Sequence, residues 1–195
     1  MIRTGFVIFF AALLFPATSH AKADAEMRKK AKALLHAHLH DYDPAEAHDS
    51  LMDMNGDGYD DIIVEFYYGA GTGLKNGVDL IMYDPAKKTF DARQSIRLVN
   101  PTFYFKKREV VSYYIASGGG EAKKQKWNGI KLKLIENIVV DVDSKTGLEF
   151  SFTQKNHLTG KVTKWKATEM VLPKEYNYFQ YTPLVTSPHN LLHTH

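Results

Sequence analysis

The sequence predicts a mainly β fold, either an antiparallel sandwich or a small propeller-like barrel, with a short N-terminal helix. Between Asp43 and Val171, short runs rich in Val, Ile, Phe and Tyr follow one another. Glycine and small polar residues separate these runs, as reversals between strands require. No helical pattern intervenes, so we do not expect parallel strands joined by crossover helices.

The N-terminus has the pattern of a secretory signal. Arg3 precedes an apolar stretch from Gly5 to Leu14, which is too short to span a bilayer, and small residues, including Ala21 and Ala23, stand at plausible cleavage positions. We therefore expect residues 1–23 to be cleaved and the protein to be periplasmic or secreted, with no membrane span after cleavage. The alternative is that this stretch is retained as a membrane anchor.

The chain has the length and composition of one main domain. Its 195 residues are 44% hydrophobic and 24% charged, which is enough to bury one sizeable core. The sequence contains no cysteine, so it has no disulfide framework, no thiolate site and no cysteine for lipidation. We expect a calcium-stabilised β domain over residues 45–172, preceded by an amphipathic helix and linker over 24–44 and followed by a C-terminal tail over 173–195.

The charge of the chain gives little support to nucleic-acid binding. Removing residues 1–23 takes away Arg3 and Lys22 and no acidic residue, so the formal net charge falls from +3 to +1. The sequence also lacks a long run of Lys or Arg of the kind that tracks a phosphate backbone. We therefore expect no nucleic-acid partner.

Helical spacing is confined to residues 24–40, where Ala, Leu and Met recur among Lys and Arg. Within this stretch His36 and His40 lie one helical turn apart, which is the spacing of a zinc or copper pair. A second set of histidines lies at the C-terminus, at His189, His193 and His195. Because no acidic or cysteine partner completes either set, we interpret both as exposed histidines.

One acidic loop carries the most specific pattern in the sequence. Oxygen-bearing side chains stand at alternate positions from Asp53, and Asp61 closes the loop at the start of a β-branched run. A tightly curled backbone directs such side chains at one point, and calcium, which prefers roughly six to eight oxygen ligands, offsets their repulsion. A plain turn has no need of so many oxygen side chains. We therefore predict a Ca²⁺ site whose ligands are the side chains of Asp53, Asn55, Asp57 and Asp61 and the backbone carbonyl of Tyr59.

The acidic loop differs from an EF-hand. Its twelfth position is Val64 instead of a bidentate Glu, and a strand follows instead of a helix. Gly58 permits a sharp reversal, and Gly56 keeps the middle of the loop free of side-chain bulk. Because most ligands come from the protein, we expect the ion to stabilise the fold and to take no part in chemistry.

The β-strands are expected in order along the chain. The run after the acidic loop ends at a Gly-rich stretch, and Asp84-Pro85 begins a hairpin turn between the next two runs. Asn128-Gly129 has the residues of a two-residue hairpin turn. The expected strands span residues 61–68, 78–83, 89–90, 95–99, 109–116, 123–127, 130–143, 149–153 and 161–171.

The order of landmarks from Asp53 to about Val139 resembles that of single-loop FG-GAP-like calcium-binding periplasmic proteins. The landmarks are the acidic loop, the strand from Val78 to Pro85, the segment Val110-Val111-Ser112-Tyr113 and the segment from Lys126 to Leu132. Described members of this family include immunity proteins against secreted lysozyme-like effectors, and the family is similar in fold to periplasmic lysozyme inhibitors. The resemblance covers less than half of the chain. Only one acidic loop is present, so we do not expect a multi-blade propeller.

The resemblance implies a periplasmic calcium-binding inhibitor or immunity protein that acts on a lysozyme-like cell-wall hydrolase. Such inhibitors insert a loop containing Ser and Gly into the cleft of the enzyme, usually accompanied by a Tyr. The matching segment here is Ser117, Gly118, Gly119, Gly120 and Glu121, and no Tyr follows it within the motif. The implied partner is a peptidoglycan hydrolase or a lysozyme-like effector. The alternative is that this segment is an ordinary flexible hairpin loop.

A second class of function is a carbohydrate- or surface-binding module with a structural calcium site. Such a module would present aromatic rings on one exposed face, although aromatic residues in β proteins more often lie in the core. The candidate rings are Tyr67, Tyr68, Tyr104, Tyr113, Tyr114, Tyr176, Tyr178, Phe179 and Tyr181. Ser and His are scattered and no nucleophile set is evident, so we do not expect an enzyme. A hydrolase with carboxylates in a cleft is a weaker alternative.

Overall fold

The computed structural model describes residues 29–30, 33–34, 47–67, 76–90, 95–116, 118–143, 145–147 and 149–176. This part of the chain is mainly β, and it contains no helix of seven residues or more. Residues 29–30 and 33–34 are helical, within the stretch where a short helix is predicted. The expected signal peptide and the terminal histidines lie outside the described residues. Within the described residues, no helix has both the length and the hydropathy needed to cross a bilayer.

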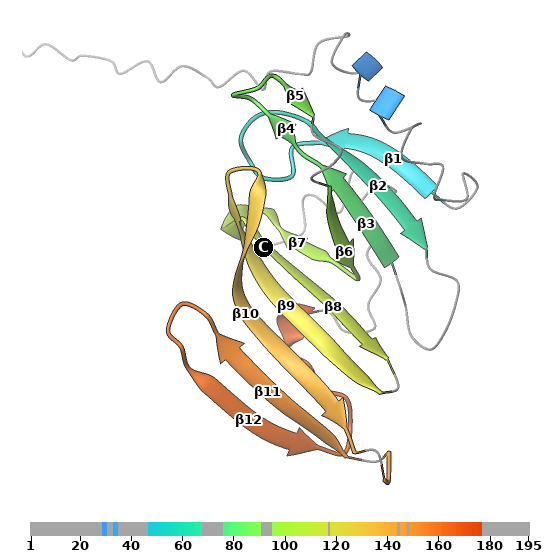
Figure 1. Cartoon of the computed structure of the whole chain (residues 1–195), viewed down its shortest axis with the longest axis vertical. Helices are drawn as coiled ribbons and strands as arrows, with labels where there is room; N and C mark the ends of the chain where they lie inside the picture. Colours follow the sequence, from blue (N-terminus) through green and yellow to red (C-terminus); the bar gives the residue numbers. More distant parts are fainter. Residues whose placement is uncertain are drawn as a thin grey trace, which may run out of the picture.

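The strands form two antiparallel sheets and a small ribbon (Figure 1). The four-stranded sheet has the order β1-β2-β3-β6, with β1 Ala47–Met52, β2 Asp61–Tyr67, β3 Asn76–Ile81 and β6 Ile96–Val99. The six-stranded sheet has the order β12-β11-β10-β9-β8-β7, with β7 Thr102–Tyr104, β8 Glu109–Ala116, β9 Gly119–Asn128, β10 Lys131–Val142, β11 Phe150–Asn156 and β12 Val162–Ala167. The ribbon pairs β4 Tyr83–Asp84 with β5 Thr89–Phe90.

The two sheets do not close into a barrel, so the predicted barrel alternative is wrong, while the predicted antiparallel β fold is confirmed. The chain passes from one sheet to the other between β6 and β7, at Asn100-Pro101. Pro101 has no N–H to continue a strand ladder. Asn100 takes the left-handed conformation (φ 47°), which Asn tolerates better than most residues.

Asn100 joins the two sheets by hydrogen bonds. Its backbone N–H donates to the carbonyl of Asn76 at 2.7 Å, and its side-chain oxygen accepts from the N–H of Asn76 at 2.9 Å. Its side-chain amide donates to the carbonyl of Tyr113 on β8 at 3.1 Å. Asn100 is itself buried, so these bonds satisfy polar groups that water does not reach.

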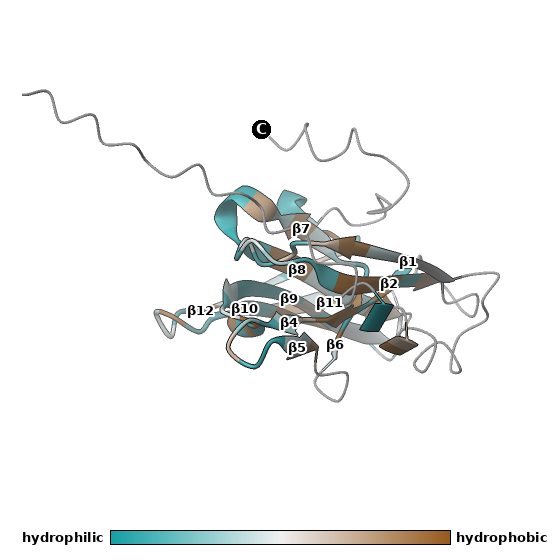
Figure 2. Ribbon diagram, turned by 90° about the horizontal axis from the view of Figure 1, so that it is seen from above, coloured by the Kyte–Doolittle hydropathy of each residue, from teal (hydrophilic) through white to brown (hydrophobic). Residues whose placement is uncertain are grey.

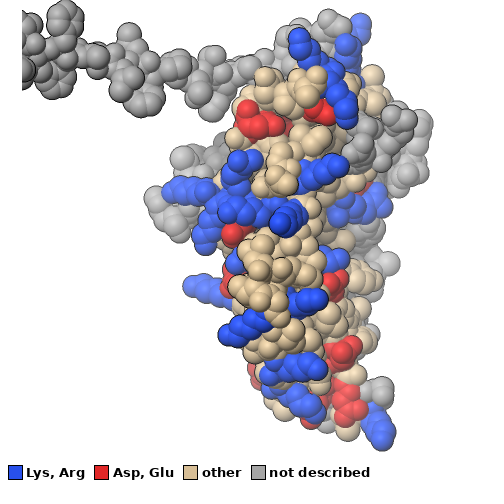
Figure 3. Space-filling view, turned by 60° about the vertical axis from the view of Figure 1, so that its left-hand side comes forward, with Lys and Arg blue, Asp and Glu red and all other residues tan. Residues whose placement is uncertain are grey.

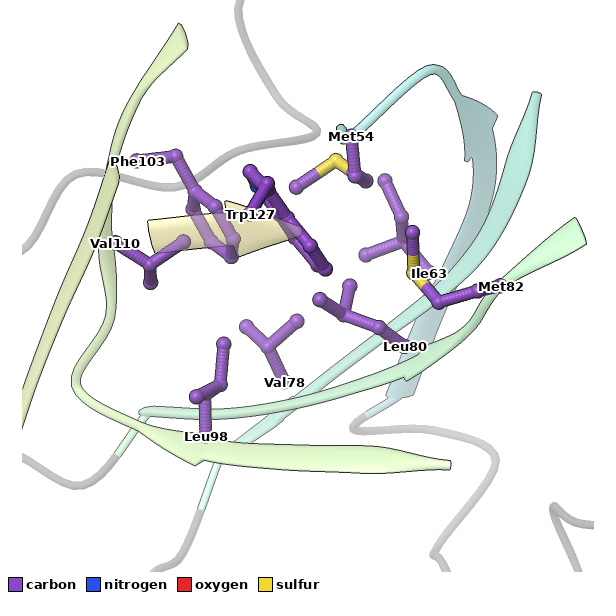
Figure 4. Close-up of a cluster of buried hydrophobic side chains, with 9 residues drawn as sticks. All are labelled: Met54, Ile63, Val78, Leu80, Met82, Leu98, Phe103, Val110 and Trp127. Carbon is purple, nitrogen blue, oxygen red and sulfur yellow. The ribbon is translucent and has the colours of Figure 1, made fainter. Parts of the chain in front are cut away.

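The main hydrophobic core lies between the two sheets (Figure 4). Trp127 on β9 packs here against side chains from the four-stranded sheet and from the acidic loop, and its exposed fraction is 6%. The buried members of this cluster are Met54, Ile63, Val78, Leu80, Met82, Leu98, Phe103, Val110 and Trp127. Seen from above, the ribbons carry both hydrophobic and hydrophilic stretches (Figure 2), and the strands β2 and β3 are buried along most of their length.

The other face of the six-stranded sheet is covered by the C-terminal segment. Lys174–Tyr176 forms a 3₁₀ turn whose Tyr176 side chain is fully buried among residues of β8 to β11. The hydroxyl of Tyr104 on β7 donates to the carbonyl of Glu175 at 2.6 Å. The packed chain therefore continues past residue 172 into the stretch that the sequence analysis assigned to the tail.

The expected strands match the observed ones best where apolar and β-branched residues are dense. β2, β8 and β10 agree with the expected strands within about two residues at either end. Two observed strands were not expected from the sequence: β1, whose His, Asp and Ser give no strand pattern, and β7, which follows a proline. Both short strands form through pairing with an apolar neighbour, β1 with β2 and β7 with β8.

Tyr176 gives a test of the C-terminal cover. Replacing Tyr176 with Ala removes a fully buried ring, and we expect the free energy of unfolding in urea to fall by about 3–5 kcal/mol. The matched control is Lys174→Ala in the same turn, where the side chain is exposed and the expected change is within about 0.5 kcal/mol. Equal small losses in the two variants would contradict packing of this segment against the sheet.

Candidate functional site

The acidic loop between β1 and β2 is curled around the carboxylate of Asp53. Its Oδ1 accepts the backbone N–H groups of Gly56 at 2.7 Å and Asp57 at 3.1 Å, and its Oδ2 accepts the N–H of Gly58 at 2.8 Å. Gly56 and Gly58 have φ values of 73° and 90°, which L side chains rarely adopt. Both glycines of the sequence pattern are therefore required by the backbone conformation of the loop.

Asn55 and Asp57 continue the curl. The Asn55 Oδ1 accepts the N–H of Asp57 at 3.0 Å, and the Asp57 Oδ1 accepts the N–H of Tyr59 at 3.0 Å. The Asn55 amide donates to the Asp57 Oδ2 at 2.9 Å and to the backbone carbonyl of Gly129 at 3.3 Å. Asn55 is buried, and through Gly129 it ties the acidic loop to the β9–β10 turn of the other sheet.

Asp61 lies fully buried beneath the loop. Its two oxygens accept the backbone N–H groups of Met54 at 3.0 Å and Tyr83 at 2.8 Å. Burial raises the pKa of Asp61 to about 7, the charges of Asp57 and Asp53 add to this rise, and the two backbone hydrogen bonds oppose it. The folded state thus favours the protonated carboxyl, so the stability that this group contributes is present at low pH and is lost as the pH rises through about 7.

The predicted calcium ligands lie together in one loop, but their carboxylates are not tightly clustered. Across the described residues, no three His, Cys, Asp or Glu side chains are grouped closely enough to hold a metal ion. A calcium ion here would depend on the amide oxygen of Asn55 and the carbonyl of Tyr59 as well as on carboxylates, which is a mixed set that calcium accepts. All of the predicted donors are oxygens, the ligand type that calcium prefers, so the calcium site stays a prediction from the sequence.

The Ser-Gly segment lies at the turn between β8 and β9, and the expectation that all of it forms a loop is wrong. Gly118 is in the turn, whereas Gly119, Gly120 and Glu121 belong to β9 and pair with both β8 and β10. Ser117 lies outside the described residues.

Close approach of neighbouring backbones explains the glycines of β9. A Cβ on Gly120 would lie 2.0 Å from the carbonyl oxygen of Tyr114, and one on Gly119 would lie 2.3 Å from that of Val140. Gly119 also has a φ of 108°. These glycines therefore permit tight pairing of strands within the sheet, and they are not signs of a mobile loop.

The strands beside this turn carry an exposed aromatic ring and a polar network. Tyr114 on β8 is 53% exposed and pairs across the strands with Glu121 on β9. The carboxylate of Glu121 accepts the amide of Asn137 at 2.9 Å and forms an ion pair with Lys123 at 2.9 Å. His157 contacts the amide oxygen of Asn137 through its Nε2 at 2.8 Å, which extends the network from β9 to the turn after β11.

The aromatic rings do not form a shared exposed face among the described residues. Tyr113 and Tyr176 are buried, and Tyr104 is partly buried with its hydroxyl bonded to Glu175. Tyr114 is the exposed aromatic side chain in the described part of the chain. The ring of Tyr67 and the whole of Tyr68, Tyr178, Phe179 and Tyr181 lie outside it.

Comparisons with known proteins assign no family to this chain. No protein-family model matches it, and no curated protein matches it. Among solved structures, the chain is similar to one described as the structure of a Xanthomonas type IV secretion system related protein, with 16% sequence identity and a TM-score of 0.38. The match covers 59% of this chain and 56% of that chain, so the chain spans little more than half of the length of that protein.

The glycines of β9 can be tested with a matched pair. Gly120→Ala places a methyl group 2.0 Å from a backbone carbonyl of the neighbouring strand, and we expect the free energy of unfolding to fall by about 1–3 kcal/mol. Gly118→Ala meets no atom within 4 Å, so its expected change is within about 0.5 kcal/mol. Urea denaturation measures both. Similar stability of the two variants would mean that Gly120 is not held between the strands.

Proposed function

We propose that this protein is a calcium-stabilised periplasmic binding protein that inhibits a lysozyme-like cell-wall hydrolase, with the β8–β9 turn as the contact. The observation that carries the proposal is the position of Tyr114. It stands 53% exposed on β8, near the Ser-Gly turn, while most large hydrophobic side chains of the sheet are buried. An exposed aromatic ring on a rigid element is the usual anchor of a protein interface.

On this proposal Tyr114 takes the place of the Tyr that is absent from the Ser-Gly motif. The inhibitors that the sequence resembles use a Tyr together with the Ser-Gly loop, and no Tyr follows within the motif here. Tyr114 comes before the turn, on the strand that leads into it, and is paired with Glu121. On this proposal the ring and the turn enter the cleft of the hydrolase together.

The surroundings of the turn support a preorganised contact. Glu121 is fixed by Asn137 and Lys123, and Val139 on β10 is 37% exposed directly opposite Glu121. Because these side chains stand on paired strands, little conformational entropy is lost when a partner binds. On this proposal the protein itself catalyses no reaction, and its partner is the hydrolase.

Calcium has a structural role in the proposal. Asp53, Asn55, Asp57 and Asp61 would hold the ion, and Tyr59 would add its carbonyl. Burial is the main cause that raises the pKa of Asp61 and the charges of Asp57 and Asp53 add to it, so a bound cation would favour the ionised carboxylate. The same loop contacts the ribbon through Tyr83 and the six-stranded sheet through Gly129, so the ion would stabilise the junction between the two sheets.

The inhibitor role is tested by Tyr114→Ala. We expect the wild-type protein to inhibit at least one lysozyme of a panel in a peptidoglycan turbidity assay, and the variant to raise the inhibition constant by about tenfold or more. The matched control is Val162→Ala on β12, an exposed apolar residue four strands away from β8, which should inhibit like the wild type. Failure of the wild type to inhibit any of the enzymes would reject this function.

The calcium role is tested by comparing two neighbouring acids. Asp57→Ala removes a proposed ligand, so we expect calorimetry to show calcium affinity reduced by about tenfold or more and EGTA to leave the Tm of the variant unchanged. Asp60→Ala removes the same charge from a residue outside the proposed set, and should bind calcium and lose Tm in EGTA as the wild type does. If calorimetry detects no heat of calcium binding to the wild-type protein, the proposed calcium site is rejected.

A further inference from the structure

Basic side chains gather where the six-stranded sheet meets the acidic loop. They come from the turn between β7 and β8 and from the two strands of the β9–β10 hairpin, and all are exposed. This group, named here the basic end, consists of Lys106, Lys107, Arg108, Lys126, Lys131 and Lys133. In Figure 3, Lys and Arg side chains gather around the level at which the β9–β10 hairpin meets the four-stranded sheet.

The fold brings these residues together from separate segments. Lys133 on β10 is paired directly with Lys126 on β9, and Lys131 lies two residues earlier on the same face of β10. The backbone N–H of Trp127 donates to the carbonyl of Arg108 at 2.9 Å, which places the β7–β8 turn beside the hairpin. The chain separates Arg108 from Lys126 by 17 residues, so no continuous basic run appears in the sequence.

The basic end is not neutralised within the described structure. None of its six side chains forms an ion pair with an acidic residue there, although Lys107 lies over the ring of Tyr104 at 5.6 Å. By contrast, Lys123 and Lys124 on the same strand β9 do pair with glutamates. Across the strands Lys126 lies between Lys133 on β10 and Glu109 on β8, so this row of side chains keeps a net charge of +1 that an anionic partner would offset.

Acidic residues border the basic end. Glu109 is paired with Lys126 across the strands, and its carboxylate lies 3.9 Å from Lys124. The acidic loop touches the hairpin turn at Gly129. Neither forms an ion pair with a member of the basic end among the described residues, so its cations stay directed to solvent.

We propose that the basic end binds the surface of an anionic phospholipid membrane. Five of its six cations are lysines, whose mobile ammonium groups suit a diffuse anionic surface better than one fixed carboxylate or phosphate. The aromatic rings that flank the basic end in the chain, Tyr104, Phe105 and Trp127, are partly or fully buried, so they offer no exposed ring on which bases of single-stranded nucleic acid could stack. The lipid surface is therefore favoured over nucleic acid.

The position of the basic end fits a protein that works beside a membrane. β8 runs from Glu109 at the basic end to Ala116 beside the Ser-Gly turn, so the two surfaces lie at opposite ends of one strand, about 25 Å apart. A protein bound to lipid through the basic end would hold that turn and Tyr114 away from the membrane. The lipid proposal rests on the cations alone, and it stands whether or not the turn inhibits a hydrolase.

The test measures binding of the whole protein to vesicles in EGTA, which prevents calcium from bridging carboxylates and lipids. We expect phosphatidylcholine vesicles that contain about one third phosphatidylglycerol to bind the protein about tenfold or more tightly than pure phosphatidylcholine vesicles. The triple variant K126E/K131E/K133E should lose this difference. The matched control K155E/K161E/K164E has the same net charge, alters exposed lysines on and between β11 and β12, and should keep most of it.

Three outcomes would overturn the proposal. The first is equal binding of the wild-type protein to the two kinds of vesicle. The second is an equal loss in the two triple variants, because binding would then depend on net charge and not on the basic end. The third is binding of a short DNA to the wild-type protein that is tighter than vesicle binding and is lost in K126E/K131E/K133E alone, which would assign the surface to nucleic acid. Both triple variants are checked for the cooperative urea unfolding of the wild type before use.

Discussion

The buried carboxylate of Asp61 is the group on which the junction of this fold depends. It receives backbone N–H groups from two separate segments, at Met54 in the acidic loop and at Tyr83 in the ribbon. Met54 in turn packs with Trp127 in the core between the sheets. Burying a charged carboxylate is costly, and this burial is the main cause that raises the pKa of Asp61 to about 7. One buried carboxyl group therefore connects the loop and the ribbon beside the core.

Features that depend only on residues close together along the chain could be predicted from the sequence. Alternating and β-branched runs predicted strands such as β2, β8 and β10, and the spacing of Asp53, Asn55 and Asp57 predicted a curled, inward-facing loop. Whether the strands form open sheets or a closed barrel could not be predicted from such local patterns, because it depends on whether edge strands distant along the chain pair with each other. Nor was β1 predictable, because its His, Asp and Ser give no strand pattern and the strand forms through pairing with the edge of β2.

Two features of the surface escaped the sequence analysis for different reasons. Tyr114 was considered only as one of many aromatic residues, although the alternation of β8 already places it on the face opposite the buried Tyr113. The basic end was not predicted because the net charge of the whole chain sums these lysines with acidic residues that lie elsewhere in the structure. Its lysines become neighbours only through the register of β9 and β10, which the sequence alone does not specify.

Each sheet is built from one uninterrupted part of the chain, because the passage at Asn100-Pro101 is the connection between them in the described structure. All strand pairing before this corner is therefore completed within the first part, and all pairing after it within the second. Short-range pairing of this kind favours rapid formation of each sheet. During synthesis the strands of the four-stranded sheet leave the ribosome before Trp127 is made. The core face around Val78 and Leu80 is therefore exposed to water until Trp127 can pack against it.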